Sequence, residues 1–308
     1  MISRRNIRVK VMQTLYAAFT REGDNKKEEA LKTLDKHLEQ SLQLFVFLIY
    51  NLTEIARYSE IDARQKASKH LPTQQDLIVN TKIAGNLLLW QILEHPTYNE
   101  AIKTFKIDLK SDQDWIRKLY LELVETDFYK KYISLPGRDK KDEKEILEFI
   151  FTDLMLPNDD FVAYLEEYFV HWEDDCEMMN LLLLNFLQKP NTNNFRQFVS
   201  TEKLKFAKDL LISVIEKEDV CNEYIKSKLQ NWDPERTAVI DMILMRMGIC
   251  EFLYFETIPT KVTINEYIEL AKDYSTPQSG HFVNGILDSI HKDLLAENKL
   301  HKISFKKS

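Results

Sequence analysis

The chain has 308 residues, of which 44% are hydrophobic and 30% are charged, and its net charge is −7. This length allows one large or two ordinary domains. The acidic balance excludes a chain that binds nucleic acid over its whole surface, so any such surface must be local. With only 6 Gly and 8 Pro, the chain has few helix breakers, and its composition predicts an all-α fold.

The amino terminus does not look like a secretion signal, because three arginines lead into an amphipathic segment rather than a uniformly apolar one. The longest apolar run, residues 44–50, is too short to cross a bilayer. The three cysteines are isolated and have no zinc or disulfide spacing. We therefore expect a cytoplasmic protein without membrane segments, metal or cofactor.

Residues 3–20 predict a basic amphipathic helix, in which Ile7, Val11, Leu15 and Phe19 recur every four residues, and Met12 and Tyr16 widen the apolar stripe. Four basic side chains gather at its start. Positive charge is unfavourable at a helix amino terminus, where the backbone dipole is positive. Two interpretations remain open, a solubilising helix start and a contact with an anionic partner. The basic residues are Arg4, Arg5, Arg8 and Lys10.

Residues 31–67 predict one long helix, and residues 70–200 contain further apolar helical stripes separated by prolines. Within that region, residues 141–180 hold 13 acids against two lysines. The apolar stripes indicate that the region folds, and its charge should repel the phosphates of a nucleic acid. We expect it to serve as a support or a protein-docking face away from any nucleic-acid site, although a lid over a binding site remains the alternative.

Residues 239–252 form a strongly apolar helical run that Asp241, Arg246 and Glu251 interrupt. The preceding pair, Asp233-Pro234, predicts the start of this helix. An unpaired buried carboxylate would be costly at position 241. Asp241 should therefore lie on an exposed turn or pair with Arg246, unless a function keeps it there.

The stretch 258–287 predicts a loop and two helices. Thr263 and Glu266 have the spacing of a capping box, and Thr276-Pro277 is a favoured start for the second helix. Gly285 lies within the second apolar stripe, where a glycine costs about 1 kcal/mol relative to alanine. That cost indicates that another group approaches the backbone there.

This stretch resembles the carboxy-terminal signature of the NusB family, the bacterial transcription antitermination factors. The family's basic opening segment, followed by Gln-x-Leu-Tyr, is similar to Gln13, Leu15 and Tyr16 and the arginines before them. The matching signature residues are Pro259, Val262, Ile264, Asn265, Glu266, Glu269, Leu270, Ala271, Lys272, Phe282, Val283, Asn284, Gly285 and Leu287.

The resemblance implies a non-enzymatic factor that binds boxA RNA together with NusE, a ribosomal small-subunit protein, within the RNA polymerase antitermination complex. It also implies phosphate contacts from the four basic residues of the first helix and a NusE contact at Asp241. Polar or stacking contacts with RNA would come from Gln278, Ser279, His281, Phe282 and Asn284. Residues 1–69 and 201–308 would form NusB-like helical bundles, with 70–200 as a helical insertion, because ordinary members are roughly half as long.

Two other functions remain open. NusB-like domains also occur fused to ribosomal RNA methyltransferases, although this chain shows neither a nucleotide-binding glycine loop nor a catalytic constellation. A purely helical interaction scaffold is the second alternative, and it would leave the first helix's basic cluster without a role.

Overall fold

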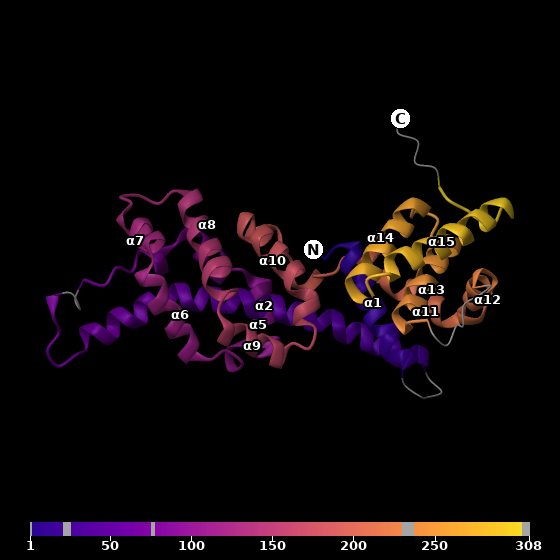
Figure 1. Cartoon of the computed structure of the whole chain (residues 1–308). Coiled ribbons are helices and arrows are strands. Elements are labelled where there is room, and N and C mark those ends of the chain that lie inside the picture. The colour runs from indigo at the N-terminus through magenta and orange to yellow at the C-terminus, as the bar shows by residue number, and fades with distance from the viewer. Residues whose placement is uncertain (1, 21–25, 75–77, 230–236, 304–308) are drawn as a thin grey trace. The chain divides into compact units, whose positions relative to one another are not determined.

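A computed structural model describes residues 2–20, 26–74, 78–229 and 237–303, and every regular element in these ranges is a helix (Figure 1). The predicted all-α fold is therefore confirmed. Its contacts divide the chain into two compact units. Unit 1 comprises Met1–Ile2 and Glu39–Phe198, and unit 2 comprises Ser3–Leu38 and Val199–Ser308. None of the helices in the described ranges combines the length and the apolar character needed to cross a membrane.

Unit 2 is built around one central helix, α13, which contacts most of the other helices in the unit. The other helices of unit 2 are α1 (Arg4–Phe19), the first part of α2 (Lys26–Ala67), α11 (Thr201–Glu216), α12 (Glu218–Lys228), α14 (Thr260–Tyr274) and α15 (Ser279–Ala296). Within α13 (Val239–Tyr254), every residue from Ile243 to Phe252 except Arg246 is buried. A helix that is buried on nearly all sides must be almost uniformly apolar, which explains the run seen in the sequence. The predicted start at Asp233-Pro234 lies outside the described residues.

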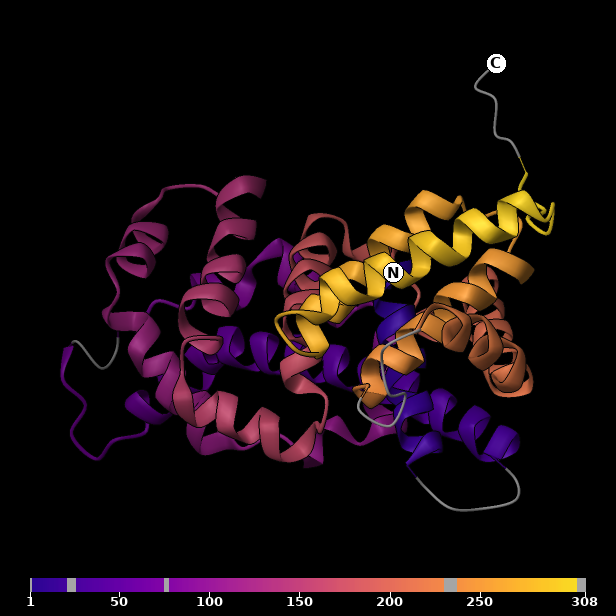
Figure 2. The same cartoon turned by 45° about the vertical axis from the view of Figure 1, so that its right-hand side comes forward.

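The close packing of α13, α14 and α15 requires a glycine at position 248. A Cβ atom there would lie 2.9 Å from a methyl carbon of Leu287 and 3.4 Å from the ring of Tyr267. α14 and α15 lie side by side in both views (Figures 1 and 2). The absent side chain thus lets two helices approach α13 together.

The starts of α14 and α15 differ from their predicted positions. α14 begins at Thr260, so Thr263 is inside the helix, and its hydroxyl donates to Glu251 Oε2 over 2.9 Å instead of capping. The predicted capping box is therefore wrong, because a tertiary acceptor captures the threonine side chain. α15 begins at Ser279, two residues after Pro277.

Unit 1 contains the rest of α2 and a series of mostly short helices. Local caps explain several of the starts, since the side chains of Asp112, Thr126 and Asn158 each accept a backbone N–H of the following turn. The α-helices that follow α2 are α4 (Leu87–Leu93), α5 (Pro96–Phe105), α6 (Gln113–Glu125), α7 (Asp127–Ser134), α8 (Lys140–Phe149), α9 (Asp159–Tyr168) and α10 (Trp172–Gln188).

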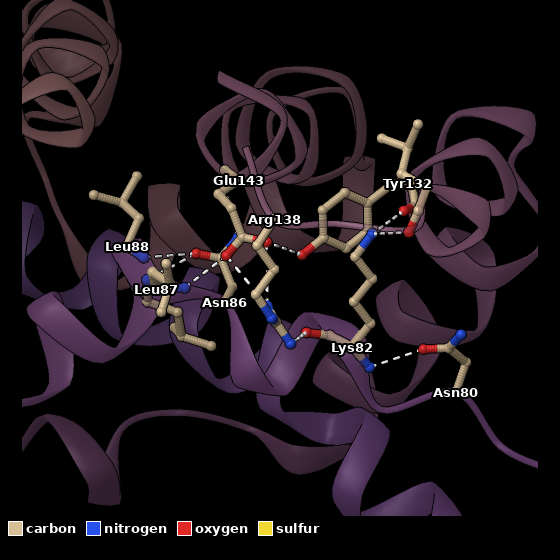
Figure 3. A network of polar contacts seen from close by, with 10 residues as sticks. Asn80, Lys82, Asn86, Leu87, Leu88, Tyr132, Arg138 and Glu143 are labelled. Atoms are coloured by element: carbon tan, nitrogen blue, oxygen red, sulfur yellow. Dashed lines mark hydrogen bonds and ion pairs between the residues drawn. The ribbon is translucent and has the colours of Figure 1, made fainter. Parts of the chain in front are cut away.

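A buried carboxylate connects the start of α4 to α7 and α8 in unit 1 (Figure 3). Glu143 accepts hydrogen bonds from the Tyr132 hydroxyl at 2.9 Å, the Arg138 guanidinium at 3.1 Å and the backbone N–H of Leu87 at 2.6 Å. Asn86 caps α4 and donates its amide to the Glu143 carbonyl. Because these groups supply the hydrogen bonds that the buried carboxylate needs, the cluster has a structural role: it holds helices of the predicted insertion together.

Candidate functional site

The first helix places two of its arginines on the surface of unit 2. Arg4 pairs with Glu202 at the start of α11, and Arg5 donates to Asp273 Oδ2 near the end of α14 over 2.8 Å. About 40% of each arginine side chain is exposed. Ion pairs at this exposure contribute little stability, so either guanidinium can exchange its carboxylate for a phosphate at low cost.

Arg8 and Lys10 occupy the interior instead, with exposed fractions of 2% and 1%. Arg8 donates from Nε to Glu251 Oε1 over 2.7 Å and contacts Glu266 over 3.3 Å. Burial alone would lower the pKa of Arg8, but the hydrogen bond to Glu251 and its negative charge outweigh burial and raise it. The assignment of Arg8 and Lys10 to RNA contacts is thus corrected, because neither side chain reaches the surface.

Glu251 is the centre of this internal cluster. Its carboxylate accepts two hydrogen bonds from Arg8, one from Thr263 and one from the Tyr267 hydroxyl at 2.7 Å. Burial and the adjacent Glu251 charge raise the pKa of Tyr267 well above its usual value, so its hydroxyl remains a donor. The cluster joins α1 to α13 and α14 and makes the first helix an integral part of unit 2.

The pair between Arg5 and Asp273 brings the first helix beside the break between α14 and α15, although 268 residues separate the partners. The residues that follow the break were predicted to contact RNA. Gln278, His281 and Asn284 are exposed there, and Phe282 is half-buried. The structure therefore brings Arg5 to the end of α14 that precedes this segment in the chain, whereas Ser279 is buried and cannot contact RNA directly.

A cavity of about 640 Å³ opens between the start of α13 and the start of α15. Its wall contains both Asp241, for which the resemblance implied a contact with NusE, and residues for which it implied contacts with RNA. It is thus one concave site, within the size range of ligand pockets. Its lining residues are Thr237, Ala238, Asp241, Thr276, Gln278, Ser279, His281 and Phe282.

Asp241 is 5% exposed, and only one of its two carboxylate oxygens accepts a hydrogen bond. Its Oδ2 accepts from the Ser279 hydroxyl over 2.8 Å, whereas its Oδ1 is buried without a hydrogen-bond partner among the described residues. Arg246 pairs with Glu218 and Asn222 instead. The exposed turn and the internal pair with Arg246 are therefore both excluded, and Ser279 is the internal partner that the structure shows for Asp241.

Gly285 is exposed, and apart from its chain neighbours and the backbone of its own helix, no described atom lies within 4 Å of the place where its Cβ would be. The close approach expected there is therefore absent among the described residues.

Three residues of the site have roles that sequence reasoning did not assign, namely Glu251, Asp273 and Thr237. Glu251 did interrupt an apolar run, which is a usable signal for a buried ion pair. Asp273 and Thr237 lie in polar surroundings in the sequence, so only the three-dimensional arrangement identifies them. Among the residues that the structure describes, no cluster of three His, Cys, Asp or Glu side chains could hold a metal ion.

The NusB family model matches residues 171–292. This match includes α10 of unit 1, within the predicted insertion, and continues through α14 into α15, while α1 lies outside it. No solved structure matches the chain significantly.

Several curated proteins named transcription antitermination protein NusB are similar to the chain. That of Salinibacter ruber is 43% identical over 115 residues, which cover 37% of this chain and 65% of the relative. That of Chloroherpeton thalassium is 44% identical over 100 residues, which cover 31% of this chain and 47% of the relative. The chain thus spans about half to two-thirds of these two relatives. That of Thermodesulfovibrio yellowstonii is 38% identical over 141 residues, which cover 43% of this chain and 93% of the relative. Because the chain covers nearly the whole of this last protein at such identity, it belongs to the NusB family.

Proposed function

We propose that the chain is a transcription antitermination factor that binds boxA RNA together with NusE and promotes read-through by RNA polymerase, notably in ribosomal RNA operons. The proposal extends the family membership to RNA and protein partners. The observation that carries it is the pairing of Arg5 with Asp273, which brings a basic helix start to the end of α14, shortly before the exposed residues Gln278, His281 and Asn284 in the chain.

RNA would follow the exposed part of this surface. Arg4 and Arg5 would contact phosphates, and His281 and Phe282 offer rings on which unpaired bases can stack. Gln278 and Asn284 carry amides that both donate and accept hydrogen bonds, as base edges require. Single-stranded RNA suits such a surface, because its bases are free to turn toward protein side chains.

The charge distribution supports placing RNA on unit 2. Unit 1 carries 18 Lys and Arg against 27 Asp and Glu, whereas unit 2 carries 24 against 22. Unit 1 therefore has a net side-chain charge of −9 and unit 2 of +2. Phosphates are repelled by the first and weakly attracted by the second. The insertion would then act as a support or as a docking face for another protein.

NusE would engage the cavity at Asp241. A buried carboxylate oxygen without a partner is unfavourable in the free protein, and a donor from the partner protein would satisfy it. Asp241→Ala should then weaken NusE binding, and the melting temperature should change little because the lost internal contact is the single bond to Ser279.

Fluorescence anisotropy with a labelled boxA RNA, measured with and without NusE over a range of salt concentrations, tests the RNA contact. Replacing Arg5 by Gln should weaken binding and reduce the slope of log K against log salt by about 0.7, the value for one phosphate contact with a single strand. Arg57→Gln is a matched control, since Arg57 is similarly exposed and pairs with Glu54 in unit 1. Equal slopes for both variants would refute an RNA contact at Arg5.

A further inference from the structure

Ser279 occupies an unusual position in the cavity wall. It is 1% exposed, yet its hydroxyl lies within hydrogen-bond distance of four groups, one on α13 and three in the break between α14 and α15. It donates to Asp241 Oδ2 over 2.8 Å, accepts the backbone N–H of Thr276 over 3.2 Å, and lies 2.8 Å and 3.0 Å from the hydroxyls of Thr276 and Ser275. A hydroxyl so surrounded is fixed in place, and it fixes the carboxylate that it binds.

The hydrogen bond from Ser279 determines which oxygen of Asp241 is left for a partner. Because Oδ2 is occupied, Oδ1 is the acceptor that remains, and Asp241 lines the cavity. The Thr237 hydroxyl lines the same cavity, and it too is buried without a partner among the described residues. Two unsatisfied oxygen atoms, one of them on a carboxylate, match a cationic side chain with several N–H donors, such as an arginine.

We propose that Ser279 is the positioning residue of this site: it orients Asp241 so that Oδ1, together with the Thr237 hydroxyl of the same cavity, receives a cationic side chain of the protein partner. The proposal rests on the assignment of NusE to this cavity. It replaces the role expected for Ser279 from the sequence, which was a direct contact with RNA. In this role Ser279 acts through the Asp241 carboxylate and not by a contact of its own with the partner.

A double-mutant cycle with purified NusE tests the proposal, because coupling between two residues appears as non-additivity. Asp241→Ala is expected to weaken NusE binding by about tenfold or more, the usual effect of losing a hydrogen bond to a charged group. Ser279→Ala should weaken it by a smaller factor. In the Asp241→Ala background, Ser279→Ala should cause no further loss.

Ser275→Ala is the matched control, since Ser275 contacts the Ser279 hydroxyl but has no hydrogen bond to Asp241. It should leave affinity unchanged, even where it lowers the melting temperature as much as Ser279→Ala does. A merely structural role for Ser279 would make the two variants alike in affinity and would overturn the proposal.

The remaining outcomes are also distinct. If Ser279→Ala loses the same factor of affinity in both backgrounds, Ser279 contacts the partner itself or acts elsewhere, and the proposal is wrong while NusE binding stands. If the unaltered chain does not bind NusE, the proposed function and this inference are both overturned. If NusE binds normally to Asp241→Ala, the partner does not use this carboxylate, and the positioning role is refuted.

Discussion

Replacing Arg8 by Met is expected to destabilise unit 2 strongly. The substitution keeps most of the side-chain length but removes both hydrogen bonds to Glu251, at 2.7 and 3.1 Å, and the contact with Glu266. Glu251 would then be a buried carboxylate held only by the Thr263 and Tyr267 hydroxyls. Removing one partner of a buried ion pair typically costs about 3–5 kcal/mol, because the other charge is left uncompensated. We expect a loss of this size, since Glu251 is fully buried.

Native-state hydrogen exchange is the suitable assay, because a chain with two units need not unfold in one transition. Peptides from α13 and α14 should lose protection in Arg8→Met, and peptides from α8 and α10 should serve as an internal control. Adding Glu251→Gln should restore part of the loss, since it removes the uncompensated charge. Unchanged protection of α13, together with weaker RNA binding, would show that Arg8 contacts RNA and would refute its role in the interior of unit 2.

Three further predictions concern other parts of the chain. Gly285→Ala should raise the stability of unit 2 by up to about 1 kcal/mol, because the position is helical and open, and denaturation measures this gain. The same substitution should weaken RNA or NusE binding if a partner approaches the backbone there, and fluorescence anisotropy measures that loss. Burial lowers the pKa of Lys302 to about 8, so above that pH the unfolded chain binds more protons than the folded chain. The stability of the folded chain should therefore rise from about pH 8 to about pH 9.5. Melting experiments that compare the chain with its Lys302→Met variant check this rise. Glu143→Ala should lower unit 1 stability by about 3–5 kcal/mol, measured by hydrogen exchange in α4 and α8, without altering RNA affinity.

Periodicity was sufficient to predict the helices with long apolar stripes. In α1, the predicted stripe residues Ile7, Val11, Met12 and Leu15 are buried, because a helix that packs on one side repeats its apolar side chains every three to four residues. Phe19 is only half-buried and Tyr16 is exposed, so the stripe is narrower than predicted. Prolines were expected to separate the helices of residues 70–200, but Pro96 occupies the first turn of the short helix α5, with His95 as the cap. Proline alone does not distinguish a helix end from a helix start.

The polar interior could not be predicted from the sequence, because its pairs join distant segments. Basic residues at the start of α1 do require anions, as expected, but the protein supplies these anions internally, as Glu202, Asp273 and Glu251. The pair between Asp241 and Ser279 is likewise formed across 38 positions. A charge in an apolar run indicates that a partner exists, and only the tertiary packing identifies it.

A hydrogen-exchange footprint of the full chain, taken with boxA RNA and NusE bound, tests most directly whether unit 2 carries both binding surfaces. We expect added protection at the start of α1 and between residues 275 and 285, with no change in α8, α9 and α10. Protection confined to those helices of unit 1, with the break before α15 unaffected, would contradict the assignment of RNA and NusE to unit 2.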